Sequence, residues 1–180
     1  MTATKWAWLL AAGLVIVVAQ LTLADELTIA GVHAELVWVL PVAVGLAAGT
    51  RAGMAAGLAG GAVADLFLPT PFGLTALAGV LLGFSVGRLG EEGIGDLSGS
   101  AWWVAPSIAF GGGLVAPVLF AILGAALGHR SYLSVTLGVV CVLDAVACAL
   151  LVRPVMRVLG SHVVDDSSRA GPLEPVRGTL

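Results

Sequence analysis

The stretch RAGMAAGLAGGAVADLFLPTPFGLTALAG, residues 51–79, predicts two apolar helices joined by a short, rigid turn. Asp65 lies near the end of the first helix, and the turn contains Pro69 and Pro71, whose rings restrict the backbone. Gly73 follows and permits close approach of the next helix. The stretch therefore predicts an antiparallel helical hairpin that keeps a carboxylate close to its turn.

Asp65 is the unusual residue of this hairpin, because an acid inside a bilayer is costly and usually faces the helix bundle or a wet cavity. Thr70 lies at the apex of the turn, and Asp65 and Thr75 each lie five residues from that apex. The two residues consequently lie at a similar depth. We expect Asp65 to face protein rather than lipid, with Thr75 as its hydrogen-bond partner.

Small residues recur at every fourth position on both sides of the turn. Residues four apart share one face of a helix, and small residues on a shared face let backbones approach closely in lipid. We expect contact seams, mostly within the monomer; the alternative is that rows arise by chance in a chain with 25 glycines. The rows are Gly45, Gly49, Gly53, Gly57 and Gly61, which Asp65 continues, and Thr75, Gly79, Gly83 and Gly87.

The composition extends the membrane interpretation to the whole chain. Of 180 residues, 59% are hydrophobic and 11% are charged, whereas a soluble domain has about 25% charged residues. So few polar side chains cannot cover the core of a soluble protein of this size. The sequence therefore predicts an all-α polytopic membrane protein.

Charged residues and polar loops divide the chain into about six predicted spans. Residues 6–24 resemble a signal peptide, but their uncharged length suits a retained first helix. The second and third spans are short, so a re-entrant hairpin is the alternative for them. The spans are 6–24, 36–49, 52–68, 72–87, 101–128 and 132–152, within a transmembrane domain of residues 1–157, and residues 158–180 are predicted to be a disordered tail.

The basic residues predict the orientation of these spans. With the N-terminus inside, Lys5, Arg51, Arg88, Arg153 and Arg157 lie on the inner side, and Arg130 lies outside. Loops on the cytoplasmic side carry the excess of Lys and Arg. We therefore expect both termini in the cytoplasm and a location in the bacterial cell (inner) membrane.

Asp144 is the second acid within a predicted span, and it lies between Cys141 and Cys148 on one helix face. A metal site built on these three residues would lack a fourth ligand nearby. We therefore expect a protonated or hydrogen-bonded aspartate among small core residues, with a polar partner contact as the alternative.

The other charged residues permit structural as well as functional interpretations. Arg51, in a tight turn, fits a topology anchor at the headgroups, or else a contact to a cytoplasmic partner or an anionic lipid. Glu91, Glu92 and Asp96 are expected to form a solvated acidic loop. The sequence contains no phosphate-binding loop, recognisable nucleophile–base spacing or metal motif. We therefore expect no enzyme, no cofactor and no nucleic-acid partner.

The succession of Arg51, small residues at four-residue spacing, Asp65, Pro-x-Pro-Phe-Gly and Thr-Ala-Leu resembles the MreD family of rod-shape-determining membrane proteins. The length and the six-span layout also match, over roughly residues 5–155. The candidate partner-binding or structural residues are Arg51, Gly53, Gly57, Gly61, Asp65, Pro69, Pro71, Gly73, Thr75 and Asp144.

The resemblance implies a scaffold of the cell-elongation complex, which directs side-wall peptidoglycan synthesis, rather than a reaction. It implies membrane lipids and an MreC-like protein as partners. Through the MreC-like protein, the resemblance implies three further partners: a RodA-like polymerase, a class B penicillin-binding protein and the MreB filament. It also implies a fold similar to the S component of energy-coupling-factor transporters.

Two other functions are alternatives to this one. The substrate-binding S component of a vitamin transporter is the alternative, although the outer half offers few polar residues for ligand capture. Ala3, Ala7 and Ala11 have the spacing of a contact to a transport partner. An ion-coupled carrier that uses Asp65 and Asp144 would be expected to have an inverted repeat, and none is visible.

Overall fold

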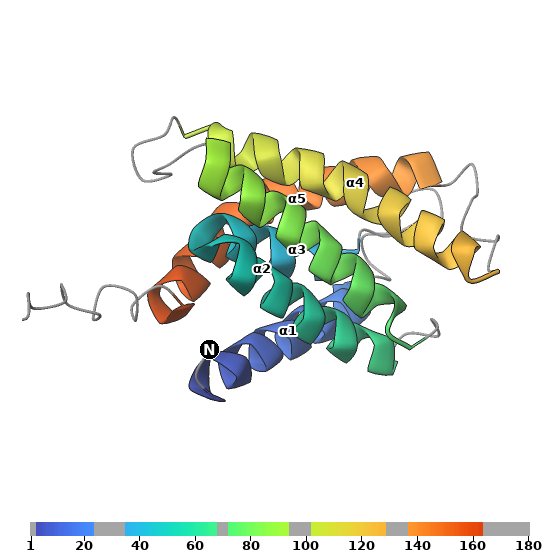
Figure 1. Cartoon of the computed structure of the whole chain (residues 1–180), viewed down its shortest axis with the longest axis horizontal. Coiled ribbons are helices and arrows are strands. Elements are labelled where there is room, and N and C mark those ends of the chain that lie inside the picture. The colour runs from blue at the N-terminus through green and yellow to red at the C-terminus, as the bar shows by residue number, and fades with distance from the viewer. Residues whose placement is uncertain (1–2, 24–34, 68–71, 94–101, 129–136, 164–180) are drawn as a thin grey trace, which may run out of the picture.

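The structure, a computed structural model, describes residues 3–23, 35–67, 72–93, 102–128 and 137–163. Every element in these ranges is helical (Figure 1), so the predicted all-α class is confirmed for the part of the chain described. The elements are α1 (Ala3–Leu23), the short 3-10 helix η1 (Leu36–Trp38), α2 (Val39–Phe67), α3 (Leu74–Gly93), α4 (Val104–Ala126) and α5 (Leu137–Val163).

Helix α2 consists of two helical halves that meet at Gly49. This residue has φ 81° and ψ −176°, a backbone conformation that favours glycine. A Cβ atom built on Gly53 would lie 2.8 Å from the Cα atom of Gly45, although eight residues of continuous helix span about 12 Å. One built on Gly60 would lie 2.9 Å from the Leu40 side chain. The chain therefore reverses at Gly49, and the halves, residues 39–48 and 50–67, lie side by side.

Helix α2 lies at the centre of the bundle and packs against α1, α3 and α5, while α4 packs on α3 and α5. In Figure 1, α3 and α4 lie on one side of α2, and α1 lies on the other. Trp38, the last residue of η1, is buried and meets Phe120 of α4 edge to face, with ring centroids 6.1 Å apart. Such aromatic pairs add to the energy of simple area burial.

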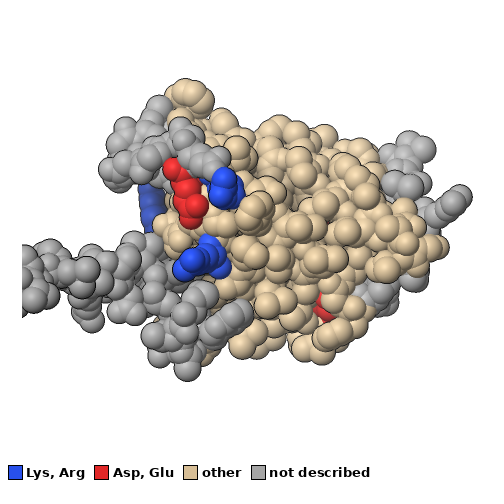
Figure 2. Space-filling view, viewed as in Figure 1, with Lys and Arg blue, Asp and Glu red and all other residues tan. Residues whose placement is uncertain are grey.

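Four helices in the described ranges are long and apolar enough to cross a membrane. These are Leu36–Phe67, Leu74–Glu91, Val104–Ala126 and Leu137–Arg157, and Ala7–Gln20 of α1 is a shorter apolar helix. The first of the four contains the reversal at Gly49, so its length is not that of one crossing. The helices suit the membrane protein that the composition predicts, and Figure 2 shows the visible charges mostly gathered at one end of the molecule.

The C-terminal boundary differs from the prediction. The sixth span was expected to end at residue 152 and a disordered tail to begin at 158, but α5 continues to Val163. The helix passes through Pro154, and Val155 and Met156 still pack against the core. A proline is tolerated in a membrane helix when neighbouring groups satisfy the freed backbone. The prediction was therefore wrong for residues 158–163, and residues 164–180 lie outside the described ranges.

Candidate functional site

Asp65 caps the N-terminus of the next helix. Its Oδ2 atom accepts hydrogen bonds from the backbone N–H of Gly73 at 2.8 Å and of Ala76 at 3.2 Å. Its Oδ1 atom accepts from the N–H of Thr75 at 3.2 Å. The first N–H groups of a helix have no partner within that helix, and their partial positive charge attracts an anion. Asp65 therefore satisfies donors that lipid could not satisfy.

The local sequence explains this geometry. Gly73 has φ 91°, so it can turn its N–H toward the carboxylate just before α3 begins. Asp65 is buried, with 6% of its surface exposed, as the cost of an acid in lipid predicts. Thr75 is its partner through the backbone N–H, whereas the buried Thr75 hydroxyl has no hydrogen-bond partner among the residues that the structure describes. The predicted roles of Pro69 and Pro71 concern residues outside the described ranges.

The glycine rows bring α2 and α3 into backbone contact. A Cβ atom built on Gly53 would lie 2.6 Å from the Gly83 carbonyl oxygen, and one built on Gly79 would lie 2.7 Å from that of Gly57. A Cβ atom on Gly61 would overlap the backbone of Ala76. Any side chain at these positions would push the two helices apart. The seam thus lies within the monomer and leads to the Asp65 cap.

Glu91 caps a helix at the other end of the same pair. Its Oε1 atom accepts from the backbone N–H of Thr50 at 2.7 Å, and its Oε2 atom accepts from the Thr50 hydroxyl at 2.8 Å. Thr50 is the first residue after the reversal at Gly49, where the second half of α2 begins. Glu91 was expected in a solvated loop, and it is exposed, but it also holds this turn.

The spacing offered a signal for Glu91 that sequence reasoning missed. Glu91 lies four residues after Gly87, so it continues the row of α3 as Asp65 continues the row of α2. Arg88 and Arg51 lie close enough to act electrostatically on Glu91. Arg51 is exposed beside this turn, far along α2 from Asp65.

Asp144 caps a third helix start. Its side chain is fully buried, and its Oδ1 atom accepts from the backbone N–H of Glu35 at 2.6 Å. Gln20 of α1 accepts from the N–H of Val37 at 3.3 Å, and Glu35 accepts from the indole N–H of Trp38 at 2.9 Å. Side chains of α1 and α5 thus satisfy donors at the start of η1, directly before α2.

Within the described ranges, Asp144 also keeps one buried oxygen, Oδ2, without a hydrogen-bond partner. Cys141 is half-buried and Cys148 is buried, and both are free thiols. Among the residues that the structure describes, no group of three His, Cys, Asp or Glu side chains lies close enough to hold a metal ion. The geometry of Asp144 is that of a hydrogen-bonded cap.

The three caps share one chemistry. In each, a carboxylate on one helix accepts from the free N–H groups at the start of another segment, which fixes the relative positions of the two. The structure joins Gly53, Gly57, Gly61, Asp65, Gly73 and Thr75 into one seam and cap, and it places Arg51 and Asp144 elsewhere. The comparisons with family models, curated proteins and solved structures gave no match for this chain.

Proposed function

We propose that this chain is a non-catalytic membrane scaffold of the cell-elongation complex, similar to MreD. The observation that carries the proposal is the hairpin of residues 51–79, whose sequence resembles that family. The same residues form the closest helix seam described here, closed by Asp65 at one end. A scaffold needs a rigid shape rather than a reactive group, and glycine seams with capped ends supply rigidity in lipid.

The scaffold would act by presenting its lipid-facing surfaces to a partner's transmembrane helix. Leu66, Phe67 and Phe72 are exposed at the turn end of the hairpin, beside the Asp65 cap. We propose an MreC-like protein as the direct partner. The RodA-like polymerase, the class B penicillin-binding protein and the MreB filament would be reached through it, at the inner membrane.

The proposed topology has six crossings with both termini in the cytoplasm. The reversal at Gly49 supports it, because it turns α2 into two antiparallel segments with Arg51 at their junction. The first segment, with η1, covers residues 36–48 and rises about 20 Å, so it would need local thinning of the bilayer. Exposed Trp102 and Trp103 at the start of α4 suit the cytoplasmic interface.

A vitamin-transporter S component is the alternative, and one observation favours it. Gln20 and Asp144, both buried, gather with Glu35 at the start of α2, which gives one end of the bundle a polar interior. A polar ligand would need such groups. In the present arrangement, however, the Gln20 and Asp144 side chains accept from backbone N–H groups of η1 and its flank.

A pull-down from native membranes tests the proposal. Tagged protein would be purified in mild detergent, and its partners would be identified by mass spectrometry. Recovery of MreC-like and RodA-like proteins is expected. Compared at equal amounts of folded protein in the membrane, an Asp65→Leu variant should lose them, whereas Asp65→Asn, which keeps an acceptor oxygen, should retain most of them. Recovery of an energy-coupling transmembrane subunit with its ATPases would instead establish the alternative.

A further inference from the structure

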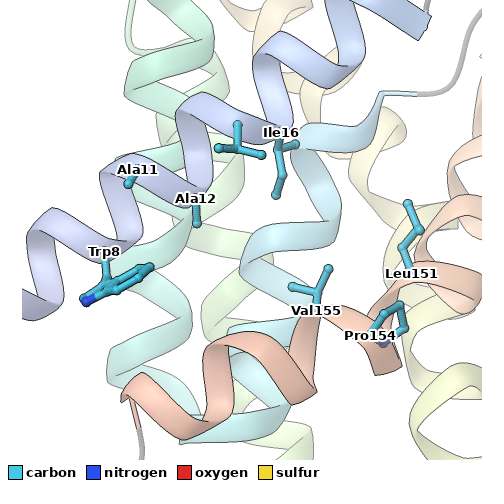
Figure 3. A pocket seen from close by; sticks show the side chains of 8 residues that line it. Trp8, Ala11, Ala12, Ile16, Leu151, Pro154 and Val155 are labelled. Atoms are coloured by element: carbon cyan, nitrogen blue, oxygen red, sulfur yellow. The ribbon is translucent and has the colours of Figure 1, made fainter.

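An apolar groove separates α1 from α5 on the surface of the bundle (Figure 3). It has a volume of about 380 Å³. Helix α1 contributes Ala11 and Ala12 together with larger apolar side chains, and α5 contributes Pro154, whose ring replaces a backbone donor. The described side chains that line it all belong to apolar residue types. Its lining includes Trp8, Ala11, Ala12, Leu151, Pro154 and Val155.

The dimensions of the groove fit one hydrocarbon chain. A methylene group occupies roughly the volume of a water molecule, about 30 Å³, so the groove holds about a dozen methylenes. Along α1 the groove extends from Trp8 to Ile16, which corresponds to about 12 Å of helix. A transmembrane helix needs a seam of about 30 Å. An acyl chain therefore fits the space better than a partner helix does.

The charges near one end of the groove fit an anionic headgroup. Arg157 follows Pro154 by three residues on α5, so it lies within about 5 Å of the groove along the helix axis. Arg157 is exposed, and within the described ranges its guanidinium has no ion-pair partner. Arg153, four residues earlier, donates to the Trp102 carbonyl oxygen instead. An exposed arginine at a bilayer surface attracts anionic lipids.

We propose that the groove between α1 and α5 binds one acyl chain of an anionic phospholipid, whose headgroup lies against Arg157. The inference requires only that the chain be embedded in a bilayer. It does not depend on the scaffold proposal or on which side of the membrane the arginines face. A bound lipid would fill a gap that lies between two helices of the same chain.

Native mass spectrometry of the purified full-length protein tests this site. The protein would be equilibrated with equal amounts of phosphatidylglycerol and phosphatidylcholine, washed stepwise in detergent, and weighed with its retained lipid. The wild-type chain should retain one phosphatidylglycerol. Arg157→Gln should lower the preference for phosphatidylglycerol about five-fold, since one basic residue at an anionic surface contributes about 1 kcal/mol.

A second part of the experiment fills the groove with a larger side chain. Ala11→Leu, on the exposed part of the lining, should abolish retention, and Ala126→Leu, an exposed position on α4, should leave it unchanged. Circular dichroism would verify that both variants are folded. Equal retention in all variants, or equal retention of the two lipids by the wild type, would overturn the proposal. If Ala11→Leu lost a co-purified protein but still retained the lipid, the groove would bind a partner helix instead. That result would overturn the proposal.

Discussion

Asp65 and Glu91 hold the α2–α3 pair together from its opposite ends. Asp65, near the end of α2, accepts from the N–H groups at the start of α3. Glu91, near the end of α3, accepts from Thr50 at the start of the second half of α2. Each acid continues a row of small residues at four-residue spacing. The same row thus provides a packing seam and the carboxylate that closes it.

Replacing Asp65 with leucine should destabilise the protein strongly. Three backbone N–H groups would lose their acceptor, and an unpaired buried donor costs about 1–3 kcal/mol. We expect the free energy of unfolding to fall by about 3 kcal/mol, measured by circular dichroism as sodium dodecyl sulfate is titrated into mixed micelles. Asp65→Asn should lose less than half as much. Wild-type stability of Asp65→Leu would contradict the cap.

The sequence was sufficient to predict the features that depend on local spacing. The glycine rows predicted the seam, and the cost of an acid in lipid predicted that Asp65 is buried. The partners of Glu91 and Asp144 were not predictable in this way. Glu91 meets Thr50 only because the chain reverses at Gly49, and Asp144 meets Glu35 across 109 positions of sequence. Such contacts depend on how helices pack, which spacing within one helix does not specify.

Glu91 should contribute less to stability than Asp65, because Glu91 is exposed and water competes for its hydrogen bonds. Glu91→Ala should lower the midpoint of the same unfolding titration by a smaller amount than Asp65→Leu does. A double-mutant cycle with Thr50→Val isolates the bond between hydroxyl and carboxylate. The two changes should be non-additive, and strict additivity would show that this bond contributes nothing.

A single methyl group should distinguish a glycine of the seam from a glycine outside it. In Gly57→Ala the new Cβ atom would overlap the backbone of Gly79, so α2 and α3 would have to separate. In Gly111→Ala the Cβ atom meets no atom of the described part of the chain within 4 Å. We expect Gly57→Ala to give little folded monomer on size-exclusion chromatography. Gly111→Ala should be as stable as the wild type, or up to about 1 kcal/mol more stable, since alanine favours helix. Equal behaviour of the two variants would argue against a close seam.

Asp144 should be replaceable by asparagine but not by leucine. Asparagine keeps an oxygen that can accept from the Glu35 N–H, and it adds no charge to a fully buried position. Leucine removes the acceptor and leaves a donor unpaired, which should cost about 1–3 kcal/mol in the free energy of unfolding. The unfolding titration described for Asp65 measures both variants. If asparagine were as harmful as leucine, an oxygen that accepts from the Glu35 N–H would not be what this position requires, and the cap would no longer explain why the chain buries an acid in α5.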